Sequence, residues 1–120
     1  STGGVRMQES VNALLQMVKV SCLINYLKQK NIPYISILLN PCMGGVSASL
    51  ATLGDLNMAE PDALIGFTGQ KIIKNLPGID LPVKVQNSNN MLNHGFLDML
   101  INRKTIKNTL FNILNFYLKT

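Results

Sequence analysis

The apolar segment YISILL (34–39) constrains the fold more than any other part of the sequence. It directly follows Pro33 and contains no charged residue, as is typical of a strand buried on both faces of a sheet. Such strands occur in α/β proteins, whose helices cover the sheet. A helical pattern of apolar residues precedes the segment, and shorter strand-like segments follow it. We therefore expect an α/β fold.

The hydrophobic periodicity predicts further helices and strands on both sides of this strand. Before it we expect a helix that runs from about Val11 to Leu27 and ends in KQKN (28–31), where Pro33 stops it. After it we expect a helix over 46–53, strands over 56–61 and 63–67, a helix over 68–75, a loop over 76–90, a helix within 90–101 that Gly95 closes before a strand, and an amphipathic helix over 102–120.

The first residues, STGG, lead directly into the first helical pattern. A Gly-Gly turn into a helix normally needs a preceding strand to position it. We therefore expect residues 1–120 to be the C-terminal part of a single larger domain, with its first strands absent. Such a chain should expose an apolar sheet edge and apolar core surface.

Charge and composition bear on the class of partner. The formal net charge is +5, but Lys and Arg form no dense cluster with interleaved aromatic residues. Nucleic-acid binding is therefore a weak interpretation, and an anionic ligand such as a nucleotide-like thioester suits the charge equally well. Neither a signal peptide nor an apolar stretch of membrane-spanning length is present, so we expect no membrane partner and a soluble, intracellular protein.

Two glycine pairs have the same form, in STGG before the first helical segment and in MGG (43–45) before the second. Glycine allows a substrate to approach the backbone and tolerates unusual dihedral angles. The start of a helix leaves amide hydrogens unpaired, and its dipole favours negative charge. Together these features suit an anion, or an oxygen that becomes negative during a reaction. The alternative is that the glycines only form tight turns and allow close packing.

Other reactive side chains have weaker support. Ser47 and Ser49 follow the second glycine pair, but the pattern is not a Gly-x-Ser-x-Gly elbow and His94 lies far along the chain. Cys42 has no histidine near it in sequence, and Cys22 lies in a helical apolar pattern that favours a buried free thiol. His94 precedes Gly95, so we expect it at a helix end. The two cysteines predict neither a disulfide framework nor a metal site.

Several longer segments carry a recognisable pattern. STGGVRMQES, PYISILLNPCMGGVSASLATLGDLNMAEPDALIGFTG and HGFLDMLI together resemble the β subunit of the carboxyltransferase of multisubunit acetyl-coenzyme A carboxylase, of the bacterial or plastid type. The resemblance runs through the entire chain and is strongest from Pro33 to Gly69.

The resemblance implies a crotonase-like fold of repeated β-β-α units. It also implies transfer of a carboxyl group from carboxybiotin, held on a biotin carboxyl carrier protein, to acetyl-coenzyme A. The product would be malonyl-coenzyme A for fatty-acid synthesis, in the cytoplasm of a bacterium or the stroma of a plastid. The expected partner is the carboxyltransferase α subunit, in an α2β2 heterotetramer. The zinc ribbon of the family would lie upstream, so this chain should hold no metal.

The same resemblance assigns roles to individual residues. The backbone amides of Gly44 and Gly45 would form an oxyanion hole. The substrate-binding residues would be Gly3, Gly4 and Arg6 in the first matching segment, and Gly69 at the end of the second. Arg6 could instead pair with Glu9 in a solvated ion pair.

The chain also departs from the family pattern. STGGVRM stands where SSGGARM is usual, Cys42 replaces a threonine and Asn40 an aspartate, and residues 68–90 differ most. Two alternatives to an active carboxyltransferase stay open. One is a truncated assembly fragment without catalysis, and the other is a crotonase-like hydratase or isomerase, which would need paired glutamates where Glu60 stands alone.

Overall fold

Parallel strands form the main sheet at the centre of the molecule, in a computed structural model that describes residues 1–69, 73 and 85–118. This sheet has three strands in the order β1-β3-β5. Ile35 is the register partner of Leu56 in the first pair, and Met58 is the partner of Met99 in the second. The strands are β1 (Ile35–Leu38), β3 (Leu56–Ala59) and β5 (Met99–Leu100).

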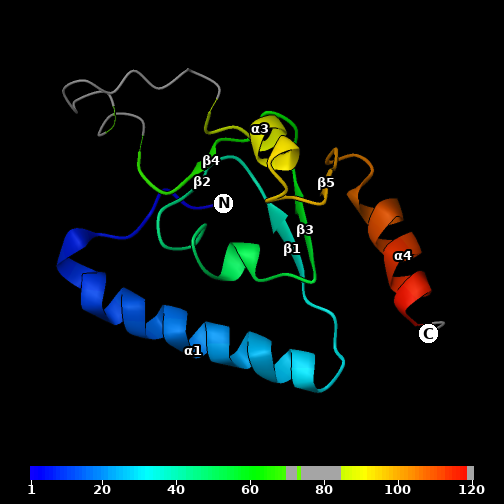
Figure 1. Cartoon of the computed structure of the whole chain (residues 1–120), viewed down its shortest axis with the longest axis horizontal. Helices are drawn as coiled ribbons and strands as arrows, with labels where there is room; N and C mark the ends of the chain where they lie inside the picture. Colours follow the sequence, from blue (N-terminus) through cyan, green and yellow to red (C-terminus); the bar gives the residue numbers. More distant parts are fainter. Residues whose placement is uncertain (70–72, 74–84, 119–120) are drawn as a thin grey trace.

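A smaller parallel sheet lies at the end of the main sheet (Figure 1). It consists of β2 (Cys42–Met43) and β4 (Ile65–Gly66). Near the N-terminus, Thr2 adds a parallel bridge to Cys42 and so extends this sheet on its other side. The strand after Pro41 was not expected from the sequence, because two residues are too few to show any periodicity.

Helices flank the two sheets (Figure 1). The long helix α1 runs beneath them and contacts the short helix η2, whereas α3 packs against β5. The amphipathic α4 follows β5 and extends away from the sheets. The helices are η1 (Met7–Glu9), α1 (Ser10–Gln29), η2 (Leu50–Thr52), α3 (Ser88–Asn93) and α4 (Ile106–Tyr117).

The structure confirms the expected α/β class and a strand within 34–39, of which 35–38 pair, but its burial alternates: Ser36 and Leu38 are buried, and Ile35 and Ile37 are half-buried. The helix expected over 46–53 is wrong. Residues 44–49 form turns, and only Leu50–Thr52 form a short 3-10 helix. Ser49 has φ −136° and ψ −109°, outside the helical region, and therefore separates the turns from η2. Most of the helix expected over 68–75 lies outside the described residues, as does the loop expected over 76–90 up to residue 84. The end of that expected loop is wrong, because α3 already begins at Ser88.

The core lies between the sheets, η2 and the segment around Leu97. Leu38, Ala59 and Ile65 are buried there, each with 4% exposure or less. Met58, in the central strand of the main sheet, is completely buried. The second glycine pair, Gly44 and Gly45, follows Cys42 of this core and is thus connected directly to the best-packed part of the chain.

The outer face of α1 is apolar and exposed. Val11, Leu15 and Val18 expose 60–68% of their surface, whereas the inward-facing Ile24 exposes 5%. Phe111 and Phe116 of α4 are similarly exposed, at 65% and 71%. Apolar surface of this extent marks an interaction face. Among the described residues, no helix is both long and apolar enough to cross a membrane.

Replacement of Met58 tests this description of the core. Met58→Ala should lower the free energy of unfolding by about 2–5 kcal/mol, because it leaves a cavity where no solvent reaches. Met58→Leu, which nearly preserves volume, should cost less than about 1.5 kcal/mol. Urea unfolding followed by circular dichroism gives both values. Equal effects of the two substitutions would contradict a tightly packed site at this position.

Candidate active site

Backbone pairing brings the two glycine pairs to the same edge of the smaller sheet. The amide of Thr2 donates to the carbonyl of Pro41 at 2.7 Å, and the amide of Met43 donates to the carbonyl of Thr2 at 2.9 Å. On the other side, the amide of Cys42 donates to the carbonyl of Leu64 at 2.8 Å. The segments before both glycine pairs are therefore neighbours and run in the same direction.

Glycines follow all three paired segments at their carboxyl ends. Gly3 and Gly4 follow Thr2, Gly44 and Gly45 follow β2, and Gly69 comes three residues after β4. In α/β sheets, the carboxyl ends of parallel strands are where ligands bind. The glycines that the sequence singled out thus lie along one edge.

The two glycine loops touch. A Cβ atom placed on Gly44 would lie 3.2 Å from the Cα atom of Gly4, a backbone atom that has little freedom to move. Gly44 has φ +74° and Gly4 has φ +107°, values that residues with a side chain rarely adopt. Gly44 is therefore favoured as glycine by both its φ and the approach of the loops, whereas Gly4, at which an added Cβ would meet no described atom within 4 Å, is favoured by its φ alone.

The amides of the second loop differ in their hydrogen bonding. The Gly44 amide is already used, because it donates to the carbonyls of Gly66 and Phe67, both at 3.1 Å. In contrast, the amides of Gly45 and Val46 donate to no other described residue. In the first loop, the Gly4 amide donates to Thr2 Oγ1 at 3.2 Å. The donors without a described partner that line the cavity are thus the amides of Gly45 and Val46, and the Ser47 amide that follows them is also unpaired among the described residues.

A cavity of about 320 Å³ lies between the two loops and α1. The loops contribute Gly4, Val5, Gly45 and Val46, and the facing turns of α1 contribute Ala13, Gln16, Met17 and Val20. The lining of the cavity is almost entirely apolar, so few protein groups compete there for the unpaired amides. A fixed N–H donor in such surroundings interacts more strongly with a negative oxygen than it would in water.

Met17 lies over Gly45. A Cβ atom placed on Gly45 would come within 2.8 Å of Met17 Sδ, at the far end of a flexible side chain. Sequence analysis did not single out this wall of the cavity. The sequence feature that could have identified this wall is the spacing of Ala13, Met17 and Val20. This spacing puts the three residues on one face of the helix that follows the first glycine pair.

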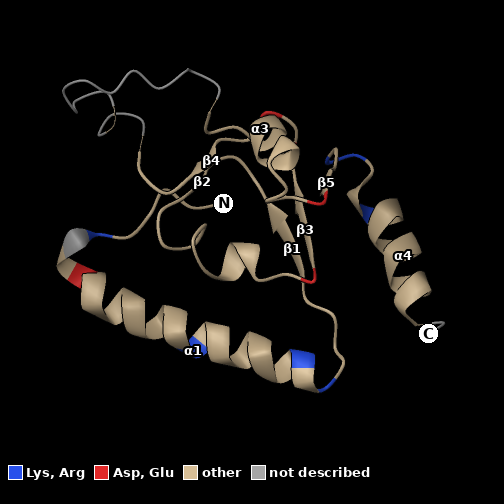
Figure 2. Cartoon of the chain, in the orientation of Figure 1, with Lys and Arg blue, Asp and Glu red and all other residues tan. Residues whose placement is uncertain are grey.

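Arg6 and Gly69 lie at the margins of this edge. Arg6 is exposed in the segment between the first glycine pair and α1. The ion pairs among the described residues are Lys28–Asp55 and Arg103–Glu60, so Arg6 and Glu9 do not form the ion pair considered from the sequence. No atom of the described residues lies within 4 Å of a Cβ atom placed on Gly69. Among the described residues, the other Lys and Arg lie on α1, at its C-terminal end and around the start of α4, away from the glycine loops (Figure 2).

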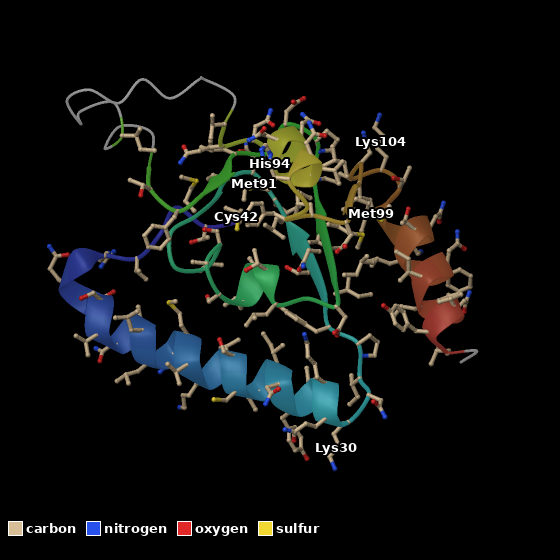
Figure 3. The ribbon with its side chains drawn as sticks, viewed as in Figure 1. Lys30, Cys42, Met91, His94, Met99 and Lys104 are labelled. Carbon is tan, nitrogen blue, oxygen red and sulfur yellow. The ribbon has the colours of Figure 1, made fainter. Side chains whose placement is uncertain are left out.

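The cysteines differ in exposure. Cys42 lies inside the molecule at 3% exposure (Figure 3), and this burial raises the pKa of its thiol above the ordinary value. The thiol therefore stays protonated near neutral pH and is a poor nucleophile. The burial expected for Cys22 is wrong, because the residue is exposed. Its helix is apolar on more than one side, so periodicity could not identify the buried face.

His94 and Glu60 have structural partners. As expected, His94 ends a helix, since it is the C-cap of α3, and its Nδ1 donates to the carbonyl of Asn90 at 2.8 Å. Both oxygens of Glu60 accept from Arg103, at 2.7 and 3.0 Å. Glu60 is thus held by a cation, which leaves no observation in favour of a hydratase or isomerase. The described residues contain no group of three or more His, Cys, Asp or Glu side chains that could hold a metal ion.

The parallel sheets and their flanking helices define an α/β protein of the crotonase-like fold class. The chain is similar to two solved structures of Pseudomonas malonate decarboxylase. The TM-score is 0.75 with the hetero-tetramer in complex with malonate, at 22% identity over 98% of this chain and 45% of the other. It is 0.68 with the hetero-dimer, at 24% identity over 83% of this chain and 43% of the other. These two similarities show the fold of the chain and nothing of its activity.

Sequence comparison gives the family. The Carboxyl transferase domain model matches residues 1–103, and the chain belongs to this family. It is 48% identical over 117 residues to the acetyl-coenzyme A carboxylase carboxyl transferase subunit beta of Wolinella succinogenes, covering 98% of this chain and 40% of the relative. It is 47% identical to the subunits beta/alpha protein of Natranaerobius thermophilus, covering 98% of this chain and 19% of that one. The chain thus spans less than half the length of these relatives.

The two glycines of the second loop should respond differently to substitution. Gly44→Ala should lower the free energy of unfolding by at least about 1 kcal/mol, because it strains a positive φ and presses on the backbone of Gly4. Gly45→Ala should cost less, because Met17 can rotate away. Denaturant unfolding of both variants measures the difference. Met17→Ala in the Gly45→Ala background should recover part of any loss, and a larger cost for Gly45→Ala would contradict the geometry.

The cysteines provide a test of burial. Cys22 should react with a maleimide at least about 10-fold faster than Cys42 near neutral pH, because exposure and thiolate character control thiol reactivity. Mass spectrometry of peptides from a timed reaction measures both rates. The variants Cys22→Ser and Cys42→Ser identify the product of each site, and equal rates in the folded protein would contradict the structure.

Proposed function

We propose that this chain forms one part of the active site of an acetyl-coenzyme A carboxylase carboxyltransferase. The reaction moves a carboxyl group from carboxybiotin, on a biotin carboxyl carrier protein, to acetyl-coenzyme A and gives malonyl-coenzyme A for fatty-acid synthesis. Membership of the carboxyl transferase family and 48% identity to a β subunit support this proposal. Carboxybiotin supplies the carboxyl group, and the residues of this chain supply fixed hydrogen-bond donors.

The contact between the two glycine loops is the observation that carries the proposal. It places an apolar cavity beside amides that have no partner among the described residues. During carboxyl transfer an oxygen of a reactant gains negative charge, and an unpaired backbone amide can stabilise that charge without moving. One such donor lowers a barrier by roughly 3–4 kcal/mol. The residues present therefore fit the chemistry that the family requires.

The two glycines of the oxyanion hole take different parts in this proposal. Gly45 donates its amide to the reacting oxygen, with the Val46 amide beside it. Gly44 shapes the turn, since its own amide is bonded to the carbonyls of Gly66 and Phe67. Gly3 and Gly4 let the first loop approach the substrate closely. Arg6 and Gly69 lie at the margins of the site and contact the anionic part of acetyl-coenzyme A.

The expected partner is the carboxyltransferase α subunit, in an α2β2 assembly. The exposed apolar side chains of α1 are the kind of surface that such an assembly covers. One relative is named as a combined beta/alpha protein, and the structural neighbours are a hetero-dimer and a hetero-tetramer. We place the reaction in the bacterial cytoplasm or the plastid stroma.

Substitution of Gly45 tests the proposal in the complete carboxyltransferase, assembled with its α subunit. Gly45→Val should lower the rate of malonyl-coenzyme A formation by at least about 100-fold, the scale of losing one oxyanion donor. The added side chain displaces Met17 and occupies the cavity beside the amide. Turnover of acetyl-coenzyme A with carboxybiotin measures the effect, and size-exclusion chromatography checks that the complex still assembles.

Two matched variants serve as controls. Cys42→Ser and His94→Gln should retain most of the activity, because the proposal gives neither side chain a chemical role. Normal turnover by an assembled Gly45→Val complex, together with an inactive Cys42→Ser complex, would refute the oxyanion role and direct attention to Cys42. A wild-type complex that assembles but forms no malonyl-coenzyme A would instead indicate an assembly fragment without catalysis.

A further inference from the structure

We propose that Ser47 and Ser49 are positioning residues that fix the direction of the unpaired amides of Gly45 and Val46. The inference rests on the proposed function and adds side chains to a site that backbone groups otherwise form. Both serines are buried, each with 8% exposure, and they lie two and four residues after Gly45. Their hydroxyl groups bond to the carbonyls of the two glycines.

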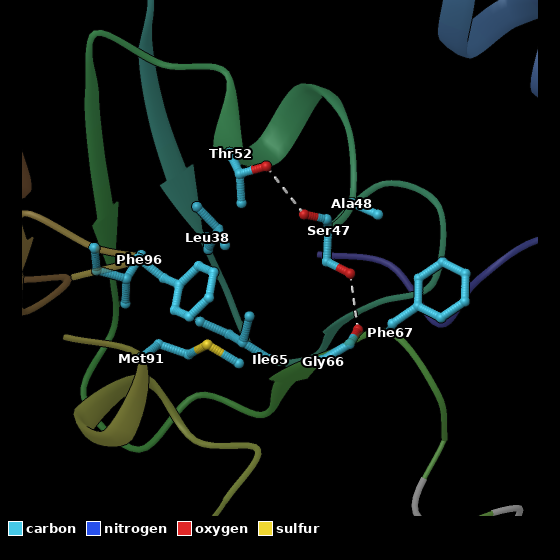
Figure 4. A pocket seen from close by; sticks show the side chains of 10 residues that line it. Leu38, Ser47, Ala48, Thr52, Ile65, Gly66, Phe67, Met91 and Phe96 are labelled. Atoms are coloured by element: carbon cyan, nitrogen blue, oxygen red, sulfur yellow. Dashed lines mark hydrogen bonds between the residues drawn. The ribbon is translucent and has the colours of Figure 1, made fainter. Parts of the chain in front are cut away.

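Ser47 holds the carbonyl of Gly44. Its Oγ lies 2.7 Å from the Gly44 oxygen and 2.8 Å from the Gly66 oxygen, and its single hydrogen can be donated to either (Figure 4 shows the second contact). The Gly66 oxygen also accepts from the Gly44 amide at 3.1 Å. Ser47 thus connects the glycine loop to the end of β4 in the adjacent part of the sheet.

The planarity of the peptide group carries this effect to the Gly45 amide. The carbonyl of Gly44 and the N–H of Gly45 belong to one planar trans peptide and point in opposite directions. The Ser47 hydroxyl and the Ala48 amide, which lies 3.3 Å from the Gly44 oxygen, fix the carbonyl end. The N–H at the other end is therefore fixed as well, and it belongs to a residue that lines the cavity.

Ser49 has the same relation to the next peptide group. Its Oγ donates to the carbonyl of Gly45 at 2.6 Å. That carbonyl shares a peptide plane with the amide of Val46, which is also unpaired among the described residues. A donor on the carbonyl oxygen polarises the amide and strengthens the hydrogen bond that its N–H can give. Each serine thus aims and strengthens one donor of the proposed site.

Thr52 provides a matched control in the same turn. Its Oγ1 lies 3.3 Å from the carbonyl oxygen of Ser47 and 3.2 Å from that of Ser49 (Figure 4 shows the first contact). It therefore resembles the serines in chemistry and location, yet its hydroxyl bonds to neither glycine carbonyl. A general requirement for hydroxyl groups in this turn would affect Thr52 and the serines alike.

The experiment compares Ser47→Thr, Ser47→Val, Ser49→Ala and Thr52→Val in the assembled carboxyltransferase. Threonine and valine have nearly the same shape, so the first two variants differ in the hydroxyl alone. Steady-state kinetics with acetyl-coenzyme A and carboxybiotin give kcat and KM, and thermal unfolding gives stability. Ser47→Val and Ser49→Ala should lower kcat by about 10- to 100-fold, the range expected for a misplaced catalytic group.

The division between kcat and KM identifies a positioning role. The KM for acetyl-coenzyme A should stay within about 3-fold in each variant, because the amides act on charge that develops after binding. Ser47→Thr should keep kcat within about 3-fold of the wild-type value, and Thr52→Val should leave kcat and KM unchanged.

Three results would overturn the inference. In the first, Ser47→Val turns over like Ser47→Thr while the wild-type complex is active, which refutes the inference alone. In the second, Thr52→Val loses as much kcat as the serine variants, which indicates a general structural effect. In the third, Ser47→Val and Ser49→Ala both fail to assemble, so that the hydroxyls serve folding. An inactive wild-type complex would refute the proposed function itself.

Discussion

The parallel pairing of Thr2 with Cys42, beside the pairing of β2 with β4, is the constraint on which the candidate site depends. It holds segments that are forty residues apart in the sequence side by side and in the same direction. Each segment then turns through glycine at the same edge. Without this pairing, Gly4 and Gly44 would be flexible turns on separate parts of the chain, and no cavity would form between them and α1. The hydrogen bonds of the smaller sheet therefore determine the geometry of the site more directly than any side chain does.

The cavity walls and the loop backbone have complementary properties. The wall from α1 is largely apolar, while the loop presents amides that lack protein partners. Gly45 and Val46, to which these amides belong, are half-buried. The serine hydroxyls bond to the carbonyls of the same peptide groups. The carbonyl side of the loop is therefore paired within the protein, and the N–H side is not.

The sequence predicted the parts of the fold with strong local signals. The segment 34–39 could be identified as a strand because apolar residues continue without a charge, and the glycine pairs could be identified as loops. The helix expected over 46–53 was wrong because its periodicity is short and the Ser49 backbone leaves the helical region. The burial of Cys22 was wrong because α1 is apolar on several sides, and only tertiary contacts decide which side is covered. The contact between Gly4 and Gly44 is non-local, so the resemblance to a family could suggest a shared site but no single segment could reveal it.

Within one glycine pair, the two residues are glycine for different reasons. At Gly44 the positive φ and the backbone of Gly4 both exclude a side chain, so this position determines whether the loops can meet. At Gly45 the backbone would tolerate a side chain, and the obstacle is the movable Met17. The fold alone does not require glycine at position 45, and the amide of this residue has no protein partner among the described residues. The approach of a substrate to this amide therefore explains the glycine better than the turn does. The demand for folding therefore falls on the first glycine, and the proposed function accounts for the second.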